Sequence, residues 1–139
     1  MELPAIKTQM EKVVAALEGR TLTRAEDLLS PIAELEPTPE TAPYVVSAAL
    51  MLSGLLASRS DISAVELLER AHALGERFTT VPASLAAEIA LTLGSCYFEH
   101  GDMGRTESVL QTAVLRARSC SPPDLALLAT GLCALAAIL

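Results

Sequence analysis

Apolar residues recur along this chain at the three- and four-residue spacing of helices, and the second half shows the pattern most clearly. One apolar stripe precedes a Gly-Asp pair and another follows it, with small residues among the large ones. The stripes comprise Leu93, Gly94 and Tyr97 before Gly101 and Asp102, and Leu110 and Ala113 after them. This spacing predicts two helices joined by a tight turn. Sustained alternation, which would indicate a strand, is not found.

The same periodicity and its breaks predict seven helices over the whole chain. The predicted helices cover residues 4–17, 23–35, 44–58, 61–78, 79–100, 103–118 and 124–139. Short turns alternate with Pro-bearing connectors, such as residues 36–43. The segment 91–96 recurs as 128–133, at a spacing of 37 residues. This organisation is typical of helical hairpins that stack on one another.

Several residues are expected to cap or interrupt these helices. Gly19 suits the C-terminal cap of the first helix. Thr23 and Glu26 have the spacing of a capping box at the start of the second. Pro31 lies inside that second helix, which it is expected to kink or shorten. Asp61 is placed to cap the fourth helix.

Residues 87–117 resemble a tetratricopeptide (TPR) repeat. The matching positions are Leu93, Gly94, Tyr97, Gly101, Asp102, Leu110 and Ala113, whereas Thr106 stands where the family prefers Ala. Repeat spacings above the usual length resemble the long-helix variant of the family. The resemblance implies an all-α, right-handed α-solenoid of about three and a half hairpins. It also implies one domain over residues 1–139, either complete or a fragment of a longer protein.

A TPR solenoid binds other proteins, and the resemblance implies a concave surface lined by the third, fifth and seventh helices. The residues expected on that partner-binding groove are Val46, Ala49, Leu50, Ser53, Leu91, Ser95, Phe98, Leu128 and Leu132. An apolar strip of this kind suits an amphipathic helix or an extended peptide. The alternative is that the superhelix closes on itself and buries the strip as core. Phe98 is the expected anchor, because aromatic residues concentrate binding energy.

The function expected from these features is a non-catalytic interaction module or adaptor. Two alternatives remain: a regulatory or sensor domain of a larger signalling ATPase or transcription regulator, and a TPR-like bacterial secretion chaperone. Neither a Gly-rich phosphate loop nor a catalytic motif occurs in the sequence. His72 and His100 lack the spacing of metal ligands and are expected on the surface. We therefore expect no catalytic residue, no cofactor and no metal site.

The charge and the cysteine content restrict which class of partner and which cellular compartment we expect. A formal net charge of −7 over 139 residues argues against nucleic acid or an anionic membrane as the partner. The uncharged segment 41–58 fits a buried helix better than a membrane span. Two of the three cysteines lie inside helical apolar patterns, where Cys behaves as a small buried apolar residue. Without a signal peptide, a cytoplasmic location is expected, or a nuclear one in a eukaryote.

The last predicted helix, residues 124–139, has no charge after Asp124. Solenoids usually end in a helix with a polar outer face. Either the chain belongs to a longer protein, or this helix packs against a partner or against a second copy. A homodimer formed through the C-terminal helix is therefore one expectation.

Overall fold

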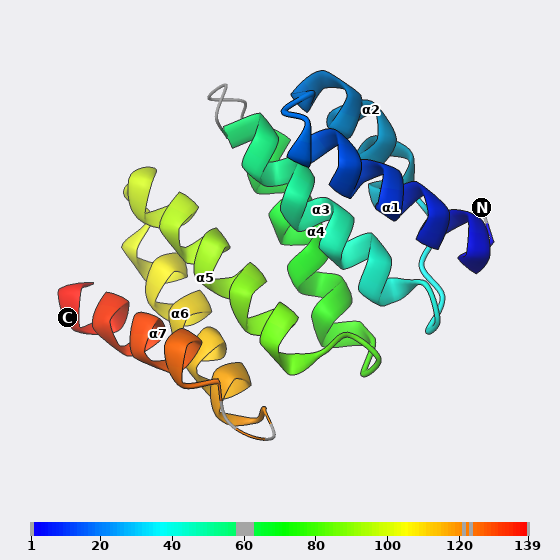
Figure 1. Ribbon diagram of the computed structural model, residues 1–139. Coiled ribbons are helices and arrows are strands. Elements are labelled where there is room, and N and C mark those ends of the chain that lie inside the picture. Colours follow the sequence, from blue (N-terminus) through cyan, green and yellow to red (C-terminus); the bar gives the residue numbers. More distant parts are fainter. Residues whose placement is uncertain (1, 58–62, 121, 123, 139) are drawn as a thin grey trace. The chain divides into compact units, whose positions relative to one another are not determined.

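The computed structural model describes residues 2–57, 63–120, 122 and 124–138. These residues form seven helices and contain no strand, so the all-α prediction is confirmed (Figure 1). The helices are α1 (Leu3–Glu18), α2 (Leu22–Ala33), α3 (Ala42–Ala57), α4 (Ser63–Arg77), α5 (Ala83–Glu99), α6 (Met103–Arg118) and α7 (Leu125–Ile138).

The chain divides into two compact units, residues 1–80 with α1 to α4 and residues 81–139 with α5 to α7. Within each unit, every helix packs against the next one along the chain, as stacked helical hairpins do. The assignment of all 139 residues to one domain stays a prediction.

The core of the first unit is built from the stripes that the sequence indicates. On α4, Ala64, Leu68, Ala71 and Leu74 are buried. On α1 and α2, the fully buried large side chains include Ile6, Leu29 and Ile32. These apolar faces explain why the helices form where they do, because burial of such a face stabilises a helix far more than its propensity does.

The start of α2 differs from the prediction. The helix begins at Leu22 with Thr21 as its N-cap residue, so Thr23 lies in the first turn and cannot cap. The Thr21 hydroxyl makes no capping bond and donates instead to the Ala16 carbonyl oxygen, at 2.9 Å. Pro31 stays within α2, which ends at Ala33, two residues earlier than predicted. The proposed cap Asp61 lies outside the described residues.

Arg70 of α4 ties together parts of the first unit that are distant in sequence. Its guanidinium donates to the carbonyl oxygens of Ala33 and Leu35, at 2.6 and 2.9 Å. Ala33 is the last residue of α2, and the last carbonyl oxygens of a helix find no N–H donor within that helix. A cation at this end also interacts favourably with the helix dipole.

The turns α1–α2 and α5–α6 share one backbone geometry. Arg20 has φ of +58° in the first turn and Gly101 has φ of +78° in the second. Each turn is closed by two backbone hydrogen bonds in a Schellman arrangement. In the α1–α2 turn, the Arg20 N–H donates to the Leu17 carbonyl oxygen and the Thr21 N–H to that of Ala16. In the α5–α6 turn, the Gly101 N–H donates to the Phe98 carbonyl oxygen and the Asp102 N–H to that of Tyr97. Gly19 is the C-cap residue of α1, as predicted, but its φ is −80°. The left-handed position is therefore Arg20, the following residue.

Replacing Arg20 by Gly is expected to stabilise the protein by about 1 kcal/mol, because glycine adopts positive φ without the steric cost of a Cβ. Urea unfolding followed by circular dichroism measures this change. Arg24→Gly, inside α2, is the control and is expected to destabilise by up to about 1 kcal/mol. A loss of stability on Arg20→Gly would contradict the role assigned to the turn.

Candidate functional site

Two glycines bring the three helices of the second unit close together. A Cβ atom added at Gly94 of α5 would lie 2.9 Å from Leu110 Cδ2 of α6. A Cβ atom added at Gly131 of α7 would lie 2.9 Å from Val114 Cγ2, also of α6. These two glycines are equivalent in the 37-residue recurrence. Each therefore permits a close helix crossing with α6, as the pattern of small residues predicts.

Polar groups near the α5–α6 turn are satisfied locally. The Asp102 carboxylate caps α6 by accepting the Arg105 backbone N–H at 3.1 Å. Thr106 is only 1% exposed, and its hydroxyl donates to the Asp102 carbonyl oxygen at 2.7 Å. This bond explains how Thr occupies a buried position where the TPR family prefers Ala. The Arg105 guanidinium lies 5.7 Å from the centre of the Tyr97 ring.

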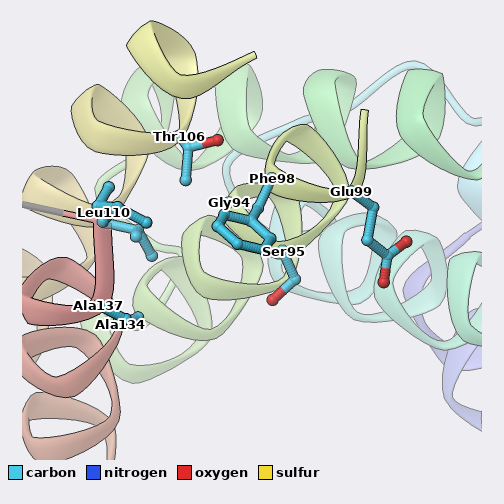
Figure 2. Close-up of a pocket in the computed structure, with 9 residues that line it drawn as sticks. Gly94, Ser95, Phe98, Glu99, Thr106, Leu110, Ala134 and Ala137 are labelled. Carbon is cyan, nitrogen blue, oxygen red and sulfur yellow. The ribbon is translucent and has the colours of Figure 1, made fainter. Parts of the chain in front are cut away.

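An apolar cavity of about 300 Å³ opens between α5, α6 and α7. Its lining residues are Gly94, Ser95, Phe98, Glu99, Thr106, Leu110, Ala134, Ala137 and Ile138. Phe98 is 50% exposed. In Figure 2, its ring lies on α5 across from Leu110 and the alanines of α7, while the Glu99 carboxylate points away. The arrangement suits an apolar group more than a charged one.

The second unit brings two of the predicted groove residues to this cavity. Ser95 is exposed and Phe98 is half-exposed, and both line it. Leu91 and Leu128 are half-buried, and Leu132 is 43% exposed on α7. None of these three lines the cavity, so their role in partner binding stays a prediction.

In the first unit, the expected exposure of the groove is wrong at three of its four positions. Val46, Ala49 and Ser53 are buried, and Leu50 is half-buried. The Ser53 hydroxyl donates to the Leu50 carbonyl oxygen at 2.7 Å. The physical reason is that α3 packs against both α2 and α4, so these side chains belong to the core. Buried side chains of this kind stabilise the unit and offer no surface to a partner.

The cavity residues of α6 and α7 were not predicted as binding residues. Leu110 was identified only as a packing position, and Ala134, Ala137 and Ile138 were not singled out. The three α7 residues follow Gly131 by three, six and seven positions, which places Ala134 and Ile138 on the same side of the helix as Gly131. The recurrence of that glycine was the signal that could have located them.

The histidines and cysteines form no recognisable chemical centre. No group of three or more His, Cys, Asp or Glu residues within the described ranges could hold a metal ion. His100 is exposed, with Nδ1 2.7 Å from the Cys96 carbonyl oxygen, whereas His72 is half-buried. Cys133 is exposed rather than buried as its pattern indicated.

Cys96 is half-buried on α5. Burial raises the pKa of its thiol above the ordinary value, and the nearby Glu99 carboxylate raises it further. A raised pKa keeps the sulfur as a thiol at neutral pH, whereas the thiolate is the nucleophilic form.

In the part of the chain that the structure describes, no helix is long and apolar enough to span a membrane.

Comparison with known proteins gives a structural match and no sequence match. No protein-family model matches the chain, and no curated protein matches it. The structure is similar to the crystal structure of PcrH from Pseudomonas aeruginosa, with a TM-score of 0.70 and 15% sequence identity. The match covers 99% of this chain and 94% of PcrH. At this identity the likeness concerns the fold, and it fits a TPR-like helical-repeat architecture.

Proposed function

We propose that this chain is a non-catalytic protein-binding module, and that the cavity beside Phe98 receives an apolar side chain of a partner helix or extended peptide. One observation carries the proposal. A large aromatic side chain stays half-exposed at the mouth of an apolar cavity instead of entering the core. Exposed aromatic residues beside a pocket are characteristic of the positions that concentrate binding energy in protein interfaces.

The hydroxyl groups of the cavity wall are already hydrogen-bonded, which favours an apolar occupant. The Ser95 hydroxyl donates to the Leu91 carbonyl oxygen at 3.2 Å, and the Thr106 hydroxyl is bonded within its own helix turn. These donors are already engaged, so the wall presents mainly methyl groups and the Phe98 ring. Glu99 lies at the rim as the charged lining residue. Burial of apolar surface would supply the affinity, and rim charges would influence the association rate.

Phe98→Asp is expected to weaken partner binding by about 30-fold or more, because it places a charge where an apolar side chain would be buried. The partner is first captured on the immobilised wild-type protein from a lysate of its source and identified by mass spectrometry. Isothermal titration of the purified partner then compares the wild type with the variant.

Met103→Asp is the matched control for this experiment. Met103 is also exposed, at 47%, and belongs to the same unit, but it does not line the cavity. Its variant is expected to bind as the wild type does, and both variants are expected to keep their helical circular dichroism. Equal affinity of Phe98→Asp and wild type would refute the proposed site.

The secretion-chaperone alternative has a specific observation in its favour. PcrH is a TPR-like secretion chaperone, and this chain matches its fold over nearly the full length of both proteins. A chaperone would hold an aggregation-prone secreted subunit in the same apolar site. Co-expression with the captured partner would then raise the soluble yield of that partner, and Phe98→Asp would abolish the gain. The regulatory-domain alternative and the cytoplasmic location stay predictions.

A further inference from the structure

Helix α7 is uncharged and mostly apolar on every side, and the described residues cover only one of its sides. Its inner side contains Leu127, Gly131, Ala134 and Ile138, of which Gly131 crosses α6 and the last two line the cavity. Its outer side contains Leu125, Ala129, Leu132 and Ala136, and all four are exposed. At 3.6 residues per turn, the two sets lie on opposite sides of the helix. Leu125 is 73% exposed, and together with the other three it forms a continuous exposed apolar strip along the helix.

Charge restricts what can cover the outer side. Residues 125–139 include no Asp, Glu, Lys or Arg, and the whole chain has a net charge of −7. Helices that lie on membranes use a basic polar face, which α7 lacks. An uncharged surface also offers no ion pair to a charged partner. A second uncharged apolar helix is the occupant whose chemistry matches it.

We propose that the outer side of α7 is a dimerisation surface, on which α7 of a second copy lies antiparallel. The spacing of four, three and four residues between the outer positions is that of a coiled-coil seam. Around a twofold axis, Leu125 faces Ala136 of the partner subunit and Leu132 faces Ala129 of the partner subunit. Each large side chain then meets a small one, so the helices approach evenly along the seam.

A parallel pair fits this sequence less well. It would place Leu against Leu at two levels of the seam and Ala against Ala at the other two. The Leu pairs would hold the helices apart, and the Ala pairs would then leave gaps. The outer stripe alternates large and small residues, so it is complementary to the same stripe running in the opposite direction. This favours a second copy of this chain over an unrelated helix.

The size of the surface sets the strength of the dimer. A helix of 14 residues is about 21 Å long. Two such helices in contact bury well under the roughly 1,200 Å² found in stable complexes. The proposed dimer is therefore weak, and it forms only at high protein concentration.

Sedimentation equilibrium of the purified chain, from about 5 to about 500 µM, tests the proposal in the micromolar range where a weak interface associates. The average mass of the wild type is expected to rise from one chain towards two. Leu132→Glu is expected to stay at one chain, because it buries a charge in the seam. Leu115→Glu is the matched control, since Leu115 is 65% exposed on α6, outside the seam. It is expected to dimerise as the wild type does.

A wild type that stays monomeric over the whole range overturns the proposal, and so does dimerisation that Leu132→Glu leaves unchanged. Should Leu132→Glu lose helical circular dichroism, Ala129→Glu replaces it, because Ala129 is an exposed position of the same seam. Phe98→Asp is expected to dimerise normally, so failure of the proposed partner site and failure of the dimer are distinguished.

Exchange of a large and a small residue tests the antiparallel register. Leu125→Ala and Ala136→Leu are each expected to weaken the dimer, because they place Ala against Ala or Leu against Leu. The double variant restores a large-to-small contact at both ends, so its dissociation constant is expected to return towards that of the wild type. A stronger dimer on Ala136→Leu alone would contradict the antiparallel arrangement.

Discussion

Replacing Leu93 by Ala is expected to lower the free energy of unfolding by about 2–5 kcal/mol. Leu93 is 1% exposed in the core between the helices of the second unit, so its truncation leaves a cavity that neighbours fill only in part. Against a total stability of about 5–15 kcal/mol, this loss is large. Urea unfolding followed by circular dichroism measures it. Hydrogen exchange is expected to show faster opening in α5 and α6.

Leu115→Ala is the control for this prediction. The same chemical change is made on α6 at a position that stays mostly in water, so stability is expected to change by less than about 0.5 kcal/mol. Equal losses for the two variants would show that Leu93 does not occupy the core position that the structure gives it.

The helices could be predicted because their signals are local. The α6 boundaries, Met103 and Arg118, match the prediction, since Asp102 caps the start and a run of polar residues and prolines follows the end. The burial of Gly94 was also predictable, because a small residue between large ones on a helical stripe indicates a close crossing.

The exposed face of α3 could not be predicted in the same way. This helix is apolar on nearly every side, so periodicity does not tell which residues face the core. The expected exposure of Val46 and Ala49 came from the TPR resemblance alone. The packing of α2 and α4 against α3 decides their burial, and that packing depends on contacts between segments distant in sequence.

Other features lack any local signal. Arg70 and Ala33 are 37 residues apart, and nothing in the surrounding sequence indicates that a guanidinium lies at the end of α2. Arg20 adopts positive φ beside a glycine that does not, against the usual preference of the two residue types. The cavity was only partly predictable: Phe98 was identified by its chemistry, whereas its α7 wall depends on how α7 packs.

Replacing Gly94 by Val is expected to destabilise the protein by about 2–3 kcal/mol. The added Cβ would lie 2.9 Å from Leu110 Cδ2 and 3.1 Å from Leu110 Cγ, and Leu110 is itself buried. Because the branch point Cγ is too close as well as the tip, rotation about χ2 alone does not relieve the overlap. Either Leu110 changes χ1 within the packed core or the helices separate, and thermal and urea unfolding would record the loss.

Gly54→Val separates this steric effect from helix propensity. Gly54 also lies within a helix, but among the described residues an added Cβ there meets no atom within 4 Å apart from its chain neighbours and the nearby backbone of its own helix. Its variant is expected to be neutral or slightly more stable, because valine has the higher helix propensity by a few tenths of a kcal/mol. Destabilisation of both variants to the same extent would remove the evidence for a close crossing at Gly94.

A second substitution at Leu110 tests whether the overlap is with that side chain. Leu110→Ala alone creates a cavity and is expected to cost about 2–5 kcal/mol. Combined with Gly94→Val, the new methyl groups occupy part of the vacated space, so the double variant is expected to lose less than the two single losses added together. A coupling of at least about 0.5 kcal/mol is expected for residues in direct contact. Strict additivity would mean that α5 and α6 do not meet at this pair.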